Sequence, residues 1–434
     1  MQTSNFQIIV LGLCTALLLV GIGVFASFGG FLGGRGIGKV VVWGTLDASV
    51  MQLAIENLRA GNKAFEGVSY IEKDPSTYDS ELLNAMANGT APDLFMLAGR
   101  DLISYSDKII TIPYSAVSQS SYLGSFIDEG QIFLTQDGAQ ALPFTVDPLV
   151  MYWNRDLFAG AGVATPPKYW NDFLSLSPKI TSLDSSSNVK RSAVALGEWR
   201  NVAHAKEILS TLFMQAGDMI ITRNTQGVPT VVFGSTPAGY PANPAESALR
   251  FYTEFANPSK TSYSWNRSLP RSTDAFVSGD LAVYLGLASE YAGLLERNPN
   301  LHFSVALAPQ IEGNATRVTY GNMTGLAIPR TAKNASGGLV AAQILSGKEA
   351  SAMFTGLTGL PSVRRDVPAD TKANAAADIF LQSALISRAW LDPAPKTTDS
   401  LFQSMIESVV SGKSQSGQAV ADTALELQRL VPLQ

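Results

Sequence analysis

Apolar and polar positions follow two alternating periods along most of the chain. From residue 39 onwards, short β-branched runs alternate with segments whose apolar residues recur at helical spacing. The runs at 39–43, 68–72 and 93–97 are typical of buried parallel strands, and those at 49–63 and 78–88 of amphipathic helices. Such alternation predicts an α/β fold in which each lobe is a doubly wound sheet flanked by helices. The first helix should bury a stripe made of Met51, Ala54, Ile55 and Leu58.

The C-terminal third of the chain is predicted to be helical, and two long surface loops are predicted before it. The loops are the serine-rich residues 182–192 and the Gly- and Pro-rich residues 234–244. Helical spacing and start signals predict helices beginning near 169 and at 202–212, 245–255, 273–278, 291–297, 338–345, 348–355, 373–386, 398–411 and 416–430.

Residues 6–32 contain no charged side chain and consist mainly of apolar residues and glycine. A run of that length can cross a bilayer core of about 30 Å. A cleavable signal peptide normally has a basic start and a shorter apolar core, whereas residues 1–5 lack Lys and Arg. We therefore expect residues 1–34 to be a transmembrane anchor or uncleaved signal, followed by a Gly-rich tether at 35–39.

Two features of this N-terminal region leave its processing and topology open. Cys14, the only cysteine, stands in a sequence similar to a lipidation box, but the residue before it is Leu13 rather than a small residue. We interpret Cys14 as part of a membrane helix. Arg35 and Lys39 follow the apolar run, and by the positive-inside tendency they argue against export of the C-terminal part.

Composition excludes several classes of function. A chain of 434 residues with 46% hydrophobic content can bury two cores, which favours two lobes. A net charge of −5 without a basic cluster excludes a nucleic-acid footprint. His204 and His302 are the only histidines and have no obvious partner, and no nucleophile elbow, zinc motif or dinucleotide fingerprint occurs. We therefore expect no enzyme activity, no cofactor and no bound metal.

Residues 142–158 carry the most informative motif. An apolar approach leads to a turn with Asp147 and Pro148, and then to an aromatic segment with Tyr152, Trp153 and Asn154. A carboxylate delivered to the end of a strand and followed by aromatic residues suits a docking site for a polar organic molecule.

This stretch resembles the interdomain crossover of the extracellular solute-binding proteins that serve ATP-driven (ABC) importers, in particular the branch that binds sugars. Further segments similar to that family follow in order at 40–47, 91–96, 275–286, 320–329 and 359–366. The resemblance implies a two-lobed, type II periplasmic-binding-protein-like fold. It implies one lobe from 40–144 plus 309–346, another from 145–308 plus 347–434, and closure of the two around a ligand.

The resemblance also implies a function and a location. The protein would be a monomer anchored at the extracytoplasmic face of a membrane, where it captures a sugar-like solute and delivers it to an ABC transporter permease. The family resemblance is stronger evidence for export of the C-terminal part than Arg35 and Lys39 are against it. Two alternatives remain open at this stage: a receptor module that senses a polyol, sugar phosphate or polyamine, and an extracellular glycan hydrolase.

Sugar sites combine flat aromatic faces with amide, carboxylate and guanidinium groups that bind hydroxyls. The candidate aromatic faces are Trp43, Tyr152, Trp199 and Tyr291. The candidate hydrogen-bonding side chains are Asp47, Arg100, Asp101, Thr145, Asp147, Asn201, Ser289 and Asn322, and Gly44 and Gly321 would let the backbone approach the ligand. Trp43 is equally compatible with a core position, Asp147 with plain turn chemistry, and the sequence does not decide whether Tyr152 or Trp153 faces the ligand.

Overall fold

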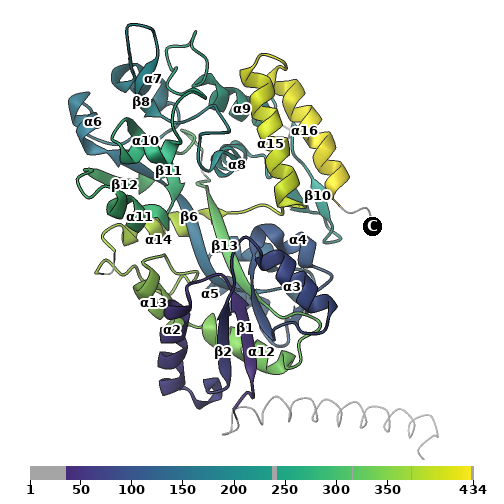
Figure 1. Ribbon diagram of the computed structural model, residues 1–434. Helices are drawn as coiled ribbons and strands as arrows, with labels where there is room; N and C mark the ends of the chain where they lie inside the picture. The colour runs from purple at the N-terminus through teal and green to yellow at the C-terminus, as the bar shows by residue number, and fades with distance from the viewer. Residues whose placement is uncertain (1–35, 237–241, 315, 373, 432–434) are drawn as a thin grey trace, which may run out of the picture. The chain divides into compact units, whose positions relative to one another are not determined.

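The computed structural model describes residues 36–236, 242–314, 316–372 and 374–431, and it divides the chain into two compact units (Figure 1). The first unit holds the described residues up to Phe95 together with Ile328–Ile344. The second unit holds Met96–Ala327 and the described residues from Leu345 onwards. Each unit is a mixture of helices and strands.

The first unit is built on parallel strands. Strand β1 (Val40–Gly44) pairs in parallel with β2 (Val68–Glu72) on one side and with β3 (Leu94–Ala98) on the other. Helices α2 (Ala48–Gly61) and α3 (Tyr78–Ala87) connect these strands, so the predicted strand–helix alternation is confirmed for this part. The predicted stripe is buried as well: Met51, Ala54, Ile55 and Leu58 are the buried residues of α2.

The later segment of the first unit is tied to β1 by a buried carboxylate. Asp93 accepts hydrogen bonds from the backbone N–H of Val41 at 3.0 Å and from that of Asn334 at 2.8 Å. The Asn334 amide in turn donates to the carbonyl of Ile37 at 2.9 Å. These bonds fix the start of α12 (Ala335–Leu345), which begins three residues before its predicted position.

A long strand organises the second unit. Strand β6 (Leu142–Asn154) pairs antiparallel with β13 (Thr319–Ala327) through its first half, and with β11 (Leu281–Leu287) and β12 (Phe303–Leu307) through its second half. The first half is paired up to Pro148, and the second half from Leu149 onwards, so the strand changes neighbours directly after Pro148, one residue beyond Asp147. Strand β8 (Val189–Val194) extends the sheet in parallel beside β11, and β14 (Ser387–Arg388) pairs with β13.

The prediction of a surface loop at 182–192 is wrong, because this segment forms a hairpin. Strand β7 (Ser182–Leu183) pairs antiparallel with β8. The Asp184 side chain closes the turn by accepting the N–H groups of Ser186 at 2.8 Å and Asn188 at 2.9 Å. A serine-rich composition concealed this strand, although the hydroxyl of Ser192 is buried and bonded to that of Ser264 at 3.0 Å.

The later helices occur where the periodicity predicts them, with ends displaced by a few residues. The helix predicted from 202 begins at Ala205, because His204 adopts a left-handed conformation (φ 58°, ψ 29°). Helices α15 (Pro395–Val410) and α16 (Ser416–Leu430) pack against each other and against α9 (Pro244–Glu254) (Figure 1). The remaining helices of the second unit are α4 (Leu102–Tyr105), α5 (Gln119–Ser125), α6 (Arg155–Gly160), α7 (Asp172–Ile180), α8 (Ala205–Ala216), α10 (Ser272–Val277), α11 (Glu290–Arg297), α13 (Lys348–Thr358) and α14 (Ala377–Leu385). Its short elements are η3 (Gly99–Asp101), η4 (Asp128–Phe133), β4 (Ile112–Pro113), β5 (Gly138–Ala139), β9 (Ile221–Arg223) and β10 (Pro229–Val231), and η2 (Lys63–Phe65) lies in the first unit.

The expected membrane anchor at 1–34, including Cys14, lies outside the described residues. Within the described part of the chain, none of the helices combines the length and the apolar character that crossing a membrane requires.

Candidate binding site

A row of polar side chains lies on one face of the β6–β13 ladder. Asp147 is the direct partner of Asn322, and Thr145 is the partner of Thr324. All four are half-buried, whereas the intervening residues on both strands are buried. The alternation follows from the period of two in a strand, which sends successive side chains to opposite faces. Among the described residues, the side chains of Thr145, Asn322 and Thr324 form no hydrogen bond, so their polar groups are available to a solute.

Tyr320 belongs to the same face, since it lies two residues before Asn322 on β13. Its hydroxyl likewise makes no hydrogen bond within the described part of the chain. Charged side chains of several other elements act on it, among them Glu207 of α8, Arg100 of η3 and Glu129 of η4. Sequence reasoning did not select Tyr320 as a site residue, although the polar alternation of Tyr320, Asn322 and Thr324 is visible in the sequence.

Asp147 is held by the turn between β11 and α11. Its Oδ1 accepts the backbone N–H of Ser289 at 2.9 Å. Ala288 of the same turn donates its N–H to the carbonyl of Pro148 at 3.0 Å. Burial raises the pKa of the Asp147 carboxyl to about 6, although the hydrogen bonds from Ser289 act in the opposite direction. A carboxylate accepts about four hydrogen bonds, so Asp147 retains acceptor capacity beyond this turn.

Tyr152 and Trp153 differ in burial. Tyr152 is fully buried, and its hydroxyl donates to the carbonyl of Leu287 at 2.6 Å. Its ring stacks on that of Tyr284 with centroids 5.9 Å apart. Trp153 is half-buried, and its ring packs edge-on against Phe158 at 5.1 Å. The Tyr152 ring is therefore part of the core, and its hydroxyl is bonded to the turn that binds Asp147. A contact between Tyr152 and a solute stays a prediction.

His204 has a partner, contrary to the sequence-based expectation. Its Nε2 lies 2.6 Å from Oε1 of Glu290, and the other oxygen of Glu290 accepts the hydroxyl of Tyr284 at 2.6 Å. Burial lowers the pKa of His204, but the hydrogen bond and charge of Glu290 outweigh it, and the net effect is a raised pKa. The sequence separation of 86 between His204 and Glu290 explains why no local pattern revealed the pair.

His302 also has a carboxylate partner, because its Nδ1 lies 3.1 Å from Oδ2 of Asp156. This pair is exposed, with 63% and 67% of the two side chains accessible to solvent.

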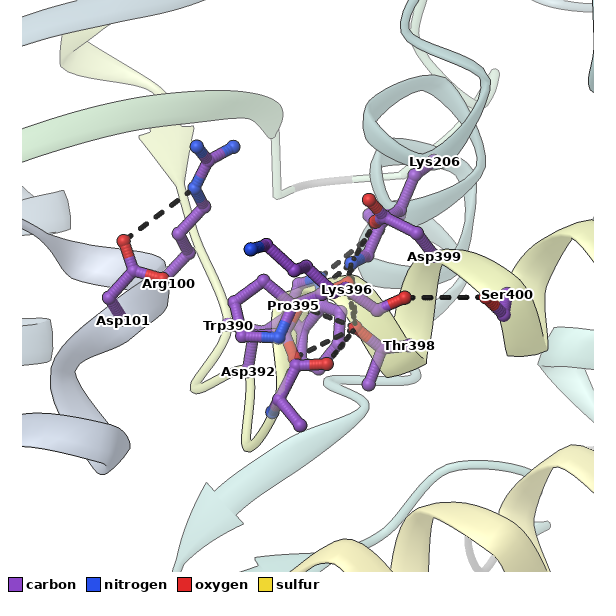
Figure 2. Close-up of polar contacts among 12 residues, drawn as sticks. Arg100, Asp101, Lys206, Trp390, Asp392, Pro395, Lys396, Thr398, Asp399 and Ser400 are labelled. Atoms are coloured by element: carbon purple, nitrogen blue, oxygen red, sulfur yellow. Dashed lines mark hydrogen bonds and ion pairs between the residues drawn. The ribbon is translucent and has the colours of Figure 1, made fainter. Parts of the chain in front are cut away.

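Two cationic side chains of the second unit, Lys206 and Arg100, differ in their contacts with carboxylates. Lys206 of α8 contacts Asp392 at 2.8 Å and Asp399 at 2.7 Å, and it donates to the Thr398 hydroxyl at 2.7 Å (Figure 2). Arg100 is half exposed and lies 3.9 Å from Asp101, apart from the Lys206 cluster in Figure 2. Burial alone lowers the pKa of Arg100, but the negative charge around it produces a net rise.

Trp199 and Asn201 were expected to contact the solute together, and the structure gives them different surroundings. Trp199 is half-buried and keeps part of its ring accessible. The amide of Asn201 is buried: it accepts the Trp265 indole N–H at 3.1 Å and donates to the carbonyls of Asn266 at 2.9 Å and Leu269 at 3.0 Å. Asn201 thus stabilises the loop, and a contact between its side chain and a solute stays a prediction.

Tyr291 and Gly321 are also engaged in packing. The Tyr291 ring is half-buried and meets Phe303 and Phe380 edge-on, with centroids 5.8 Å and 5.9 Å away. A side chain at Gly321 would collide with the carboxylate of Glu129, which is buried beneath the ladder. Burial raises the pKa of Glu129 to about 7. Packing against Glu129 is therefore sufficient to require glycine at position 321.

The candidates of the first unit have local partners. The ammonium group of Lys73 lies over the Trp43 ring, 3.9 Å from its centroid. Asp47 caps α2 by accepting the N–H groups of Ser49 at 2.8 Å and Val50 at 3.3 Å. The hydrogen bond from the Ser49 hydroxyl lowers the pKa of Asp47 most, and the two backbone bonds lower it further. Gly44 is the buried last residue of β1. Ligand roles for Trp43, Gly44 and Asp47 stay predictions.

The second unit therefore brings together Thr145, Asp147, Ser289 and Asn322, and adds Tyr320, His204 and Glu290, which sequence reasoning missed. Within the described residues, no group of three or more His, Cys, Asp or Glu side chains is arranged to hold a metal ion. The arrangement offers hydroxyl, amide and carboxylate groups without a nucleophile paired to a base. Such a surface can bind a polar molecule through hydrogen bonds.

Several solved structures share this mixed α/β, two-lobed periplasmic-binding-protein-like fold. The cyclic α-maltosyl-1,6-maltose binding protein of Arthrobacter globiformis has a TM-score of 0.73 at 15% identity, with 91% of this chain and 98% of that chain covered. UgpB of Mycobacterium tuberculosis, in complex with glycerophosphocholine, has a TM-score of 0.68 at 17% identity, with coverages of 92% and 98%. An ABC transporter solute-binding protein of Thermotoga lettingae, bound with α-D-tagatose, has a TM-score of 0.66 at 18% identity, with coverages of 91% and 100%.

The fold is that of the periplasmic binding proteins. More specifically, the chain belongs to the bacterial extracellular solute-binding protein family, whose model matches residues 55–380. The resemblance predicted from the sequence is thereby confirmed. A binding protein of Brucella abortus (strain 2308) is 24% identical over 360 residues, which cover 79% of this chain and 80% of the relative.

Proposed function

We propose that this protein captures a sugar-like solute outside the cytoplasm and delivers it to the permease of an ABC importer. The observation that carries the proposal is the row of half-buried polar side chains around Asp147. Thr145 and Asn322 offer unused donors and acceptors beside a carboxylate, which suits a molecule with several hydroxyl groups. Sugars and oligosaccharides bind to several relatives of the same fold, including those named with tagatose and maltosyl-maltose.

The half-buried rings of Trp199 and Tyr291 support the same ligand class. Aromatic faces bind the apolar face of a sugar ring, and they add affinity beyond that of the hydrogen bonds. Asn201, Asp101 and Arg100 would complete the polar contacts in the second unit. Trp43, Gly44 and Asp47 would contribute from the first.

The proposed mechanism is closure of two lobes around the solute, in the type II arrangement. The lobes are proposed to comprise 40–144 plus 309–346 and 145–308 plus 347–434. Closure requires that the solute bind the closed form more tightly than the open form, since a ligand with equal affinity for both shifts nothing. No chemical step, cofactor or metal is required, and we propose that the protein is a monomeric binding protein rather than an enzyme.

The proposed location is the extracytoplasmic side of a membrane, with residues 1–34 as the anchor and 35–39 as the tether. Fractionation of cells that express the full chain tests this part. The full chain should sediment with membranes, and Cys14→Ser should sediment equally. Recovery of a mature chain beginning near Ser27 in the soluble fraction would refute the anchor, and release on Cys14→Ser would indicate lipidation.

A thermal-shift screen of the full-length chain in detergent tests the ligand class. The panel should contain tagatose, maltotetraose, polyols, a sugar phosphate, glycerophosphocholine and a polyamine. A solute present at one hundred times its dissociation constant should add about 2.7 kcal/mol of stability. Stabilisation by a charged compound alone would replace the sugar proposal, and release of sugar from a glycan would indicate a hydrolase.

The site itself is tested by calorimetry with the stabilising sugar. Asp147→Ala should lose about 1.5–3 kcal/mol of binding free energy, the range for a hydrogen bond to a charged group, or about tenfold to a hundredfold in affinity. Asp156→Ala is the matched control, because Asp156 is an exposed carboxylate of the same unit. Parental affinity in Asp147→Ala would show that the solute binds elsewhere.

A further inference from the structure

His204, Glu290 and Asp147 form a connected polar system around a single turn. Glu290 begins α11, and its two carboxylate oxygens contact His204 and Tyr284, each at 2.6 Å. The preceding residue, Ser289, donates its backbone N–H to Asp147 at 2.9 Å. One turn therefore connects the carboxylate of the binding face to the histidine that precedes α8.

The backbone is shaped to permit this connection. His204 has a φ of 58°, in the left-handed region that non-glycine residues adopt infrequently. Gly286 lies below the Glu290 carboxylate, and a side chain there would approach Glu290 Oε2 and the Tyr284 ring, both at 2.5 Å. Glycine at 286 thus allows the carboxylate to lie across β11 between its two partners. The left-handed conformation of His204 and the glycine at 286 therefore both allow the contact between His204 and Glu290.

Charged groups from several elements act on this system. The Glu290 charge raises the pKa of Asp147, and the His204 charge lowers it. Glu129 of η4 is also coupled to Asp147. Glu207 of α8 acts on His204, and the phenols of Tyr152 and Tyr284 are buried beside Glu290. The carboxyls would raise one another's pKa in the absence of a cation, since like charges disfavour ionisation.

We propose that His204 is a positioning residue of the solute site: its contact with Glu290 holds the Ser289 turn, and that turn holds Asp147 as an ionised hydrogen-bond acceptor. An ionised carboxylate is a stronger hydrogen-bond acceptor than its protonated form, so a solute hydroxyl binds better when Asp147 is charged. The effect on binding rests on the proposed function. The effect on the ionisation of Asp147 does not require a ligand.

The ionisation is measured directly by NMR on the full-length protein in detergent, labelled with ¹³Cγ-aspartate. The Asp147 signal is identified by its loss in Asp147→Asn, and in the parent it should titrate near the pKa of about 6. In His204→Asn, which removes the charge and tolerates a left-handed φ, the midpoint should rise by about 0.5–1 pH unit.

His302→Asn is the matched control, because it breaks a histidine–carboxylate pair whose two side chains are exposed to solvent. Its Asp147 midpoint should equal that of the parent. Circular dichroism confirms that each variant is folded, and His204→Gln serves as a second neutral variant. An unchanged Asp147 midpoint in both neutral His204 variants overturns the proposal, whatever the solute is.

Affinity is then measured against pH with the most strongly stabilising sugar of the screen. The parent should lose affinity as the pH falls through the Asp147 midpoint, and His204→Asn should lose it at a pH higher by the same displacement. A shifted NMR midpoint with an unshifted binding profile overturns the role of His204 in binding. If the midpoint shifts but no sugar binds the parent, the proposed function fails and the electrostatic role of His204 stands.

Discussion

Asp147→Asn should stabilise the solute-free protein and weaken solute binding at the same time. The pKa of Asp147 is raised from 3.8 to about 6, chiefly by burial. A difference of about two units between the pKa values of the folded and unfolded states corresponds to about 3 kcal/mol of unfolding free energy at neutral pH. Because the side chain is only half-buried, solvent screening reduces this figure to about 1–2 kcal/mol. Asparagine removes the charge, and its amide oxygen can still accept the Ser289 N–H.

The sign of the pH dependence follows from the raised pKa. The folded protein binds a proton at Asp147 more readily than the unfolded chain does, so folding becomes more favourable as the pH falls from about 6 to about 4. The variant should therefore exceed the parent in stability above about pH 6, and the difference should disappear below about pH 4.

Urea unfolding at pH 7.5, 5.5 and 4 measures this difference. Asp156→Asn is the control, because its carboxylate is exposed, and its stability should stay within about 0.5 kcal/mol of the parent. Two results would refute the reasoning: an Asp147→Asn variant that is no more stable than the parent at pH 7.5, or a gain that persists unchanged at pH 4.

Three further substitutions test packing and ligand contact. Gly321→Ala should lower the free energy of unfolding in urea by about 1–3 kcal/mol, because a methyl group there meets the Glu129 carboxylate. The control Gly293→Ala should not lower it, because no atom lies within 4 Å of the added methyl group. Lys206→Met should lower the free energy of unfolding by about 3–5 kcal/mol, because it leaves the buried Asp392 without its cation. A loss below about 1 kcal/mol would show that water replaces the lysine. Trp199→Ala should weaken sugar binding by about threefold to tenfold in calorimetry, and unchanged affinity would remove Trp199 from the site.

Local periodicity predicted the elements whose stability depends on near neighbours in the sequence. The buried stripe of α2 was predictable from Met51 to Leu58, because residues three and four apart share a helix face. The strand β8 was missed because hydroxyl and charged residues interrupt its apolar pattern, and its burial arises from β11 and from Ser264. Composition alone cannot report such tertiary partners.

The candidate site was likewise predictable only where local sequence carries the signal. Asp147 was selected because of its place in residues 142–158, and Asn322 was selected because of its place in residues 320–329. Their pairing as direct neighbours depends on the register between β6 and β13. No local pattern gives that register, just as none gives the contact between His204 and Glu290. Asn201 looked like a ligand residue because a polar amide in a loop has the same sequence appearance whether it binds a solute or the Trp265 indole.

The pairing of β6 with β13 also determines when the binding face can first exist. Asp147 and Asn322 are direct partners although 175 positions separate them, so the ladder cannot form until most of the chain has been synthesised. At about 5–20 residues per second, β6 waits about 9–35 s for its partner strand. During this interval its apolar edge is unpaired, and such strand edges promote aggregation. Binding by chaperones in this interval, or transfer across the membrane before folding, would protect the nascent β6 strand.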